Sequence, residues 1–213
     1  MGLLRKFLNQ TRRPEGLLGR IMLNGMNFGH AFVADWAISL MQDMLNAHDV
    51  NQIAELGCGN GRDAGELLKI YKAAKLTAVD YSPLSVEKTI KNNQAAVNAG
   101  RMKVIHGDVS NLHSALEPQS FDLTTAFETI YFWPGLTRCF EQVFNILKPN
   151  GHFMIVTESD GRDKISKWFQ KRIDGMNTYT SSEIEAALNS AGFAYIKSTH
   201  HKSRPWLMIL ARR

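Results

Sequence analysis

Three glycines at alternate positions, Gly57, Gly59 and Gly61, follow a short apolar run at Gln52–Leu56. Glycine adopts backbone torsions that other residues avoid, and it lets a ligand approach the main chain closely. A carboxylate, Asp80, ends the next apolar run 23 residues after Gly57, where it could accept hydrogen bonds from a ribose diol. This spacing predicts a nucleotide-type binding site at the ends of two strands.

The spacing of the glycines separates two classes of cofactor. A nicotinamide-binding loop has the pattern GxGxxG, and its third glycine would fall at position 62, where the chain has Arg62. The pattern here is GxGxG, with Glu55 two positions before the first glycine. The segment Glu55-Leu56-Gly57-Cys58-Gly59-Asn60-Gly61 resembles the first motif of the class I S-adenosylmethionine-dependent methyltransferases.

Four later segments resemble further motifs of that family, in the same order. Val79–Ser82 is similar to the motif whose acidic residue binds the ribose hydroxyls, and Gly107–Val109 to the segment that reads the adenine ring. Phe121–Leu123 resembles the start of the fourth strand, and Leu147–His152 the turn before the fifth. The resemblance covers residues 50–213, and the subgroup it is most similar to is the small-molecule methyltransferases related to ubiquinone and menaquinone biosynthesis enzymes.

The resemblance implies S-adenosylmethionine as the cofactor and assigns its contacts to the glycine loop and to the ends of the following strands. The implied cofactor-binding residues are Glu55, Gly57, Cys58, Gly59, Gly61, Asp80, Tyr81, Asp108, Val109 and Phe127. Other roles stay open for some of them. The glycines could form a tight turn without a ligand, Asp80 could cap a helix, and Asp108 could cap the turn at Ser110.

Apolar strands and amphipathic helices alternate through the segment that carries these motifs. The pattern predicts strands at 52–56, 76–81, 102–106, 121–127 and 152–157, and helices at 62–74, 83–98 and 136–147. Ser82 reads as an N-cap followed by Pro83, and Thr180 with Glu183 as a capping box for a helix that ends near Gly192. An amphipathic helix is predicted around 165–173, and the segments 193–199 and 206–211 form a hairpin.

We therefore predict an α/β fold with a Rossmann-like, doubly wound sheet that is mostly parallel and has an antiparallel C-terminal strand. The family resemblance implies the seven-stranded class I methyltransferase fold. Residues 51–213 would form the S-adenosylmethionine-binding domain, and residues 1–50 an N-terminal helical cap or lid. Within the cap, one helix is expected to follow Pro14, and a second to run from Ala31 to Ala47.

Catalytic residues are expected beyond the fourth and fifth strands, because ligands bind at the carboxyl edge of such a sheet. The segment Phe127–Pro134 places Glu128 and Tyr131 beside aromatic side chains, whose faces attract cations such as a sulfonium; Phe132 and Trp133 could equally serve in packing. Methyl transfer is a direct displacement, and a general base matters only when the acceptor arrives protonated. The predicted catalytic residues are Glu128, Tyr131 and His30, with Glu158 as a further candidate base.

The composition of the chain limits the kinds of ligand and partner that it is expected to bind. The 213 residues carry a net charge of +5, with basic clusters at both ends, which we interpret as a solvated surface rather than a nucleic-acid or membrane site. The two cysteines form no CxxC or Cys/His cluster, which argues against a zinc or other metal site and fits a reducing cytoplasm. No signal peptide or membrane span is expected. A small-molecule methyl acceptor is the first prediction; a peptide or protein acceptor, or a cofactor-binding protein without methyltransferase activity, stays open.

Overall fold

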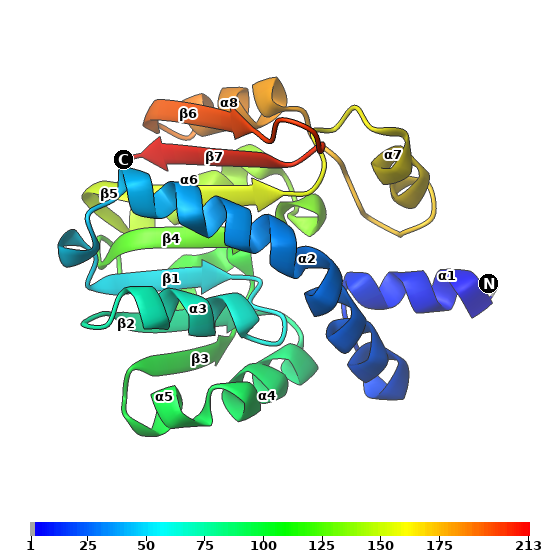
Figure 1. The fold of residues 1–213 in the computed structure, drawn as a ribbon, viewed down its shortest axis with the longest axis horizontal. Helices are drawn as coiled ribbons and strands as arrows, with labels where there is room; N and C mark the ends of the chain where they lie inside the picture. Colours follow the sequence, from blue (N-terminus) through cyan, green and yellow to red (C-terminus); the bar gives the residue numbers. More distant parts are fainter. Residues whose placement is uncertain (1–2) are drawn as a thin grey trace.

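A seven-stranded sheet forms the centre of the computed structural model, which describes residues 3–213 (Figure 1). The first two residues of the predicted cap lie outside the described residues. The strand order is β3-β2-β1-β4-β5-β7-β6. The strands are β1 (Gln52–Leu56), β2 (Lys75–Asp80), β3 (Met102–His106), β4 (Phe121–Phe127), β5 (Leu147–Thr157), β6 (Ala194–His200) and β7 (Leu207–Arg212).

Neighbouring strands from β1 to β5 are parallel, and β7 pairs antiparallel with both β5 and β6. The chain order reverses between β1 and β4, so that the carboxyl ends of these two strands open onto a crevice, as in other doubly wound sheets. The predicted α/β fold, with its mostly parallel sheet and antiparallel end, is confirmed.

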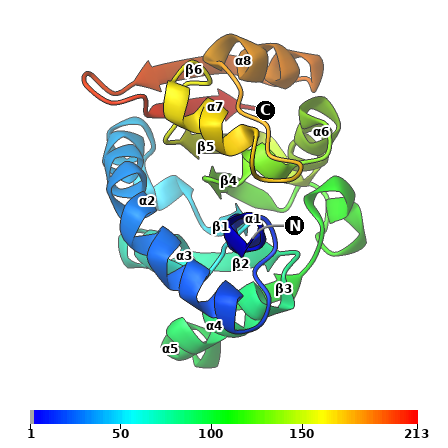
Figure 2. The same ribbon diagram turned by 90° about the vertical axis from the view of Figure 1, so that its right-hand side faces the viewer.

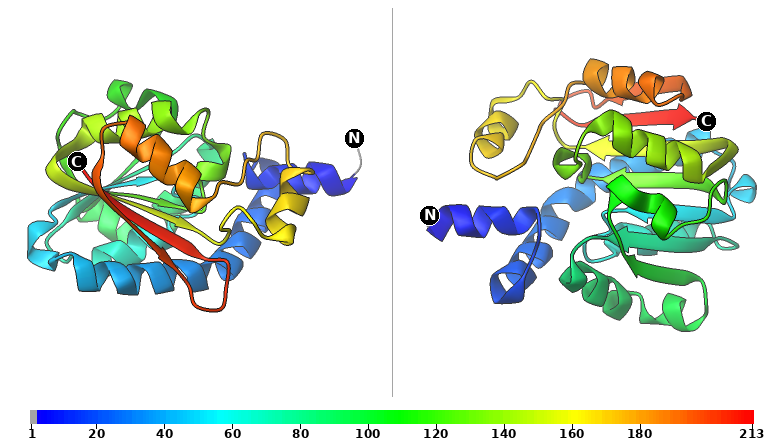
Figure 3. Two further views of the ribbon diagram at one scale, coloured as in Figure 1. Left: turned by 90° about the horizontal axis from the view of Figure 1, so that it is seen from above. Right: turned by 180° about the vertical axis from the view of Figure 1, so that it is seen from behind.

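Helices cover both faces of the sheet, as Figure 3 shows from above. On one face lie α2 (Gly16–Met44) and α3 (Arg62–Ile70), whose buried side chains share one apolar cluster with β1. On the other face lie α6 (Leu136–Ile146) and α8 (Ser181–Ser190), which pack with the opposite side of the strands. The remaining helices are α1 (Leu3–Leu8), α4 (Pro83–Asn92), α5 (Gln94–Asn98) and α7 (Lys164–Gln170), with short 3-10 turns η1 (Asn9–Thr11), η2 (Ala47–Asp49), η3 (Val109–Ser114) and η4 (Ile130–Phe132).

Local sequence signals fix several helix ends. Ser82 accepts a hydrogen bond from the Ser85 amide at the start of α4, and Thr180 and Glu183 form the predicted capping box of α8. The predicted helix 83–98 is interrupted at Asn93, where φ is −118° and ψ is 27°. The Asn93 side chain donates to the carbonyl of Gly61 at 2.9 Å, so the interruption serves the glycine loop.

Besides the interrupted helix at 83–98, two elements differ from their predicted bounds. The two helices expected around Pro14–Ala47 are one continuous helix, α2, because no proline interrupts residues 16–44 and a glycine inside a helix costs only about 1 kcal/mol. Strand β5 begins at Leu147 instead of residue 152. Its early part turns at Asn150, where φ is 64°, and pairs through Gly151 with the backbone of Arg213.

None of the helices within residues 3–213 combines the length and the apolar composition that a bilayer crossing requires. The longest, α2, has 29 residues and carries charged and polar side chains along its length.

Candidate active site

The glycine loop joins β1 to α3 and needs glycine at most of its positions. Gly57, Gly59 and Gly61 have φ values of 80°, 58° and 78°, a region that other residues rarely adopt. A Cβ on Gly57 would lie 2.2 Å from the Oγ1 atom of Thr129, whereas a Cβ on Gly59 would meet open space. The loop therefore presents bare backbone at the carboxyl end of β1.

Asp80 ends β2 beside this loop and holds its shape. One carboxylate oxygen accepts the Gly59 amide at 2.9 Å, and the other accepts the Ser82 amide at 2.9 Å. Burial raises the pKa of Asp80, while these hydrogen bonds act in the opposite direction. The hydroxyl of Ser82 caps α4, so Asp80 is not that helix's cap. The Ser85 side chain also hydrogen-bonds the Asp80 carboxylate, which still has acceptor capacity for a ligand.

Glu55 and Asp108, which were also predicted to bind the cofactor, lie in surroundings unlike those of Asp80. Glu55 is buried in β1, and its Oε2 atom has no hydrogen-bond partner among the described residues. Burial raises the pKa of Glu55 well above its usual range, and the charges of Asp63 and Asp80 raise it further. Asp108 accepts hydrogen bonds from the amide and the hydroxyl of Ser110, both at 2.8 Å, so it does cap the turn at η3.

Four polar residues meet beyond β4 and β5; we call His30, Glu128, Tyr131 and Glu158 the catalytic cluster. One oxygen of Glu128 accepts the amide of Glu158, and the other lies 3.2 Å from the hydroxyl of Tyr131, which donates to it. The Nε2 atom of His30 lies 3.6 Å from a carboxylate oxygen of Glu158. All three predicted catalytic residues are therefore together, with Glu158 as the fourth member.

The surroundings of Glu128 and Tyr131 favour the uncharged forms of these two side chains. Burial raises the pKa of Glu128 well above its usual range, and the charge of Glu158 adds to the effect. Burial also raises the pKa of Tyr131, as does the neighbouring Glu128. Glu128 has a φ of 55°, a strained backbone angle for a residue with a Cβ. The backbone is thus held in a costly conformation at the point where its carboxylate faces the pocket.

A single pocket joins the glycine loop to the catalytic cluster. Its lining includes most of the predicted cofactor residues and two of the predicted catalytic ones: His30, Gly57, Cys58, Gly59, Asp80, Tyr81, Asp108, Val109, Phe127 and Glu128. Four predicted residues do not line it, among them the candidate base Glu158. Glu55 and Gly61 lie in the flanking backbone segment, and Tyr131 reaches the pocket only through its hydrogen bond to Glu128.

The aromatic side chains after β4 divide between two roles. Phe132 and Trp133 both line the pocket. Trp133 is also buried and stacks on Phe153, with ring planes 5° apart and centroids 6.2 Å apart. The packing role that the sequence left open therefore applies to Trp133, which fixes this wall to the core.

The N-terminal segment lies beyond the carboxyl ends of the strands, with α1 in front of β1 and β2 in the view of Figure 2. We call residues 3–15 the N-terminal cover; three of them, Thr11, Arg12 and Pro14, line the pocket. The carbonyl of Pro14 accepts a hydrogen bond from Ser82 at 2.9 Å, and the carbonyl of Arg12 accepts one from Tyr81. At the other side, Asp174 pairs with Arg5 and accepts from Asn9 at 2.8 Å. Arg12 thus has a place at the pocket that the interpretation of a solvated basic end missed.

Known proteins share both the sequence pattern and the fold. The sequence model of a family described as "Methyltransferase domain" matches residues 47–204, most of the chain. The chain belongs to the methyltransferase-domain family. This membership confirms the family that the motifs predicted.

Curated relatives of this methyltransferase-family chain are longer proteins. A sterol 4-C-methyltransferase of Caenorhabditis elegans is 30% identical over 146 residues, which cover 62% of this chain and 41% of the relative. A malonyl-[acyl-carrier protein] O-methyltransferase of Priestia megaterium is 29% identical over 134 residues, which cover 60% of this chain and 46% of the relative. The chain spans less than half the length of these two proteins.

Solved structures confirm the methyltransferase fold. A chain of the complex between the Haloferax volcanii Trm112 methyltransferase activator and a methyltransferase superposes with a TM-score of 0.77 and 18% identity, covering 90% of this chain and 93% of the other. Human N-acetylserotonin methyltransferase in complex with S-adenosylmethionine has a TM-score of 0.69 and 18% identity, covering 90% of this chain and 55% of the other.

The methyltransferase pocket fits the cofactor on two observations. The remaining acceptor capacity of Asp80 suits a ribose hydroxyl, and the open space at Gly59 leaves room for a ligand against the backbone. Glu55, whose Oε2 atom has no hydrogen-bond partner among the described residues, does not line the pocket and carries no part of this fit.

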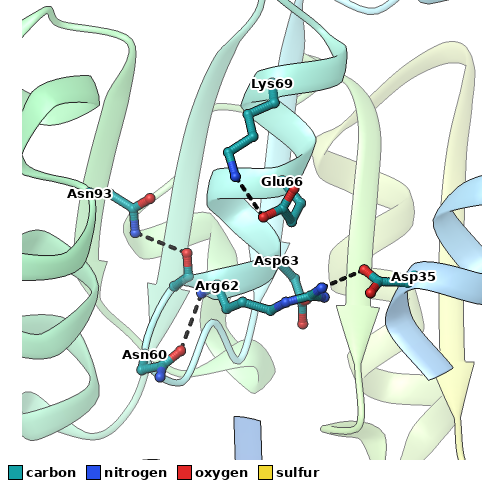
Figure 4. A network of polar contacts seen from close by, with 8 residues as sticks. Asp35, Asn60, Arg62, Asp63, Glu66, Lys69 and Asn93 are labelled. Atoms are coloured by element: carbon teal, nitrogen blue, oxygen red, sulfur yellow. Dashed lines mark hydrogen bonds and ion pairs between the residues drawn. The ribbon is translucent and has the colours of Figure 1, made fainter. Parts of the chain in front are cut away.

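The sequence did not predict the polar network at the start of α3 (Figure 4). Arg62 donates to Asp63 at 2.7 Å and pairs with Asp35 of α2, so it connects the two helices beside the pocket. Arg62 and Asp63 both line the pocket. Arg62 was the one signal for this network, because it stands where a nicotinamide-binding loop has its third glycine. Its partner Asp35 lies 27 residues earlier, and no motif connects the two.

Proposed function

We propose that the chain transfers a methyl group from S-adenosylmethionine to a small-molecule acceptor by direct displacement. The observation that carries this proposal is the continuous pocket, which places the glycine loop and Asp80 at one side and the catalytic cluster at the other. When bound, the cofactor supplies a methyl group activated by a sulfonium. The chain contributes mainly position, because a fixed alignment of reactants removes much of the entropic barrier.

Individual contacts follow from the residues that surround the pocket. Asp80 would bind the ribose hydroxyls, and the segment Asp108-Val109 the adenine ring. The backbone of Gly57–Gly59 would lie against the ligand. The predicted contact of Glu55 would require its side chain, which is buried in β1, to open onto the pocket. These assignments are supported by the lining of the pocket and by the hydrogen bonds that Asp80 has not yet used.

Glu128 is the group that we propose to accept a proton from the acceptor. A carboxylate with a raised pKa is a stronger base than an ordinary one, and a base is most effective when its pKa approaches the working pH. Tyr131 would position Glu128 through its hydroxyl, and His30 with Glu158 would carry the proton away from the pocket. The proton would thus move from the acceptor to a Glu128 oxygen and then along the catalytic cluster.

The acceptor side of the pocket favours an apolar molecule with one ionisable O–H or N–H group. Apolar residues form much of this wall: Leu23, Ala31, Ala34, Phe132 and Pro134. The names of two relatives, a sterol 4-C-methyltransferase and a phthiotriol/phenolphthiotriol dimycocerosates methyltransferase of Mycobacterium tuberculosis, refer to large apolar acceptors. We therefore place a hydrophobic small molecule ahead of a peptide or protein side chain.

The division of the chain stays part of the proposal. Residues 1–50 would act as a helical cap on the domain of residues 51–213, supported by the pocket contacts of Arg12, Pro14 and His30. Two free, buried cysteines, Cys58 and Cys139, support a reducing, cytoplasmic location.

Calorimetric titration with S-adenosylmethionine, S-adenosylhomocysteine and NADH tests the proposed cofactor site. Micromolar binding of the first two without the third is expected, followed by methyl transfer to small apolar alcohols, phenols or amines in a radiolabel assay. Binding of NADH alone would contradict the proposal. Cofactor binding without transfer to any acceptor would favour the alternative of a cofactor-binding protein that is not itself an enzyme.

A further inference from the structure

Large apolar side chains are exposed around the mouth of the pocket. Among the described residues, six of the eight large apolar side chains that are clearly exposed lie on α1, the start of α2 and α7: Leu4, Leu17, Leu18, Ile21, Ile165 and Trp168. Leu17 is 80% exposed and Ile165 is 70% exposed. Single exposed apolar residues are ordinary on a protein surface, but a group of this kind on adjoining elements indicates a binding surface.

The same elements carry the positive charge of the chain. Residues 3–23 and 160–174 contain ten lysines and arginines and only four aspartates and glutamates. The whole chain has 25 basic and 20 acidic residues, so the rest of it has no positive excess. Lys164, Lys167 and Lys171 on and after α7 are exposed, as are Lys6 on α1 and Arg20 on α2. Positive charge and exposed apolar groups therefore coincide.

These elements lie on one side of the molecule. Figure 1 shows α1, α7 and the first half of α2 beyond the carboxyl ends of the strands, and Figure 3 shows the same arrangement from above. The N-terminal cover is fastened to the loop after α7 through Asp174, which pairs with Arg5. We call the exposed apolar and basic residues on these elements the mouth surface; its elements also contribute Arg12 and Leu23 to the lining of the pocket.

We propose that the mouth surface docks on an anionic lipid bilayer. Helices that lie in a membrane interface insert leucine, isoleucine and tryptophan side chains among the acyl chains and place lysine and arginine at the head groups. Each basic residue near an anionic surface contributes attraction that falls with salt. Arg172 lies over the Trp168 ring, 3.9 Å from its centroid, so this pair would sit at the head-group level.

This docking would turn the mouth of the pocket toward the bilayer. An apolar acceptor could then enter from the membrane without crossing water, which rests on the proposed function. The docking itself does not depend on methyl transfer, because it uses exposed residues that are outside the glycine loop and the catalytic cluster. The two proposals can therefore fail separately.

Vesicle sedimentation tests the docking directly. The full chain is mixed with vesicles of phosphatidylcholine alone and with vesicles that contain phosphatidylglycerol in addition, at low and at high salt. Binding to the anionic vesicles is expected, with a blue shift of the Trp168 emission that disappears in Trp168→Phe, and with loss of binding at high salt. Failure to sediment with anionic vesicles at low salt would overturn the proposal and would leave a protein as the occupant of this surface.

A matched pair of variants identifies the surface involved. Leu17→Glu with Ile21→Glu places two charges on the exposed side of α2, and should weaken vesicle binding about tenfold or more. The control, Tyr195→Glu, changes an exposed aromatic residue on the edge strand β6, 76% exposed, and should bind as the parent does. Circular dichroism shows whether each variant is folded. Equal binding by the double variant and the control would overturn the proposal, and cofactor affinity should be unchanged in both.

Discussion

Replacement of Asp80 by alanine tests the cofactor site, because the structure shows which bonds this carboxylate already makes. The Gly59 and Ser82 amides use one lone-pair site on each oxygen, and the Ser85 side chain hydrogen-bonds the same carboxylate, which leaves one site for a ribose hydroxyl. A hydrogen bond to a charged group is worth about 1.5–3 kcal/mol. Asp80→Ala should therefore weaken S-adenosylmethionine binding by roughly ten- to a hundredfold.

The control for this variant must lose comparable structure without touching the pocket. Asp122 accepts the Asn51 amide at 2.9 Å and the Gln52 amide at 2.8 Å, at the opposite end of β1. Asp122→Ala thus also removes two backbone contacts, and it loses an ion pair with Lys148. Both variants should lower the free energy of unfolding in urea by roughly 2–5 kcal/mol.

Calorimetry at a temperature where both variants are folded separates stability from binding. Asp122→Ala should bind S-adenosylmethionine as the parent does, and Asp80→Ala should not. If Asp80→Ala keeps the parental Kd, the ribose assignment is wrong and Asp80 serves only to shape the glycine loop. If both variants lose affinity equally, the loss reflects a loosened sheet and not a missing ligand contact.

Four further predictions concern catalysis and stability. Glu128→Gln should reduce kcat about 10²–10⁴-fold and Tyr131→Phe less, both with cofactor affinity retained; parental kcat in both would contradict the catalytic placement. Burial raises the pKa of Glu128 in the folded state, so the stability that this residue contributes is lost as pH rises through that pKa, by up to about 1.4 kcal/mol per pH unit. The free energy of unfolding of Glu128→Gln, measured in urea, should therefore increase relative to that of the parent with rising pH. Parallel curves for the two proteins would contradict this. Gly57→Ala should destabilise the fold more than Gly59→Ala does. Both variants have the strain of a positive φ, which costs about 1 kcal/mol or more, but the alanine at position 57 would also collide with Thr129. Equal urea midpoints for the two variants would refute this reasoning. EDTA should leave turnover unchanged, because direct displacement of a methyl group from a sulfonium needs no Lewis acid, although ligand atoms of His30, Glu128 and Glu158 lie within 4.8 Å of one another. Loss of activity in a chelation assay would indicate a metal.

The sequence predicted best what is local along the chain. Strands β1, β3 and β4 have their predicted bounds, because each is an apolar run that ends at a glycine or a carboxylate. The positions of the glycine loop and Asp80 were likewise predictable, since the spacing of the glycines and of the carboxylate marks them along the chain. The continuity of α2 was not, because the apolar pattern was divided between a helix after Pro14 and another from Ala31, and no local signal shows that they join.

Contacts between segments that are distant in sequence could not be predicted, because no local pattern marks them. His30 and Glu158 come from different ends of the chain, and only the packing of α2 on the sheet brings them to 3.6 Å. Asn9 and Asp174 are 165 residues apart and have no motif in common. Arg62 finds Asp35 in the same way. The predicted catalytic residues were chosen by residue type and position beyond the strands, and their mutual geometry could come only from the folded chain.

The continuity of α2 determines which ligand can leave first. Its second half is held by Ala37 and Met41, which are fully buried, so the helix stays in place and keeps His30 beside the acceptor side of the pocket. If the N-terminal cover acts as the predicted lid, it would pivot before the buried part of the helix, at Pro14–Gly16, where Gly16 has a φ of 59°. Such a lid would open over the ribose side and leave the acceptor side unchanged. Exchange of spent cofactor and exchange of methylated product would then be separate kinetic events, and a tether that locks Arg5 to Asp174 should slow the first without slowing the second.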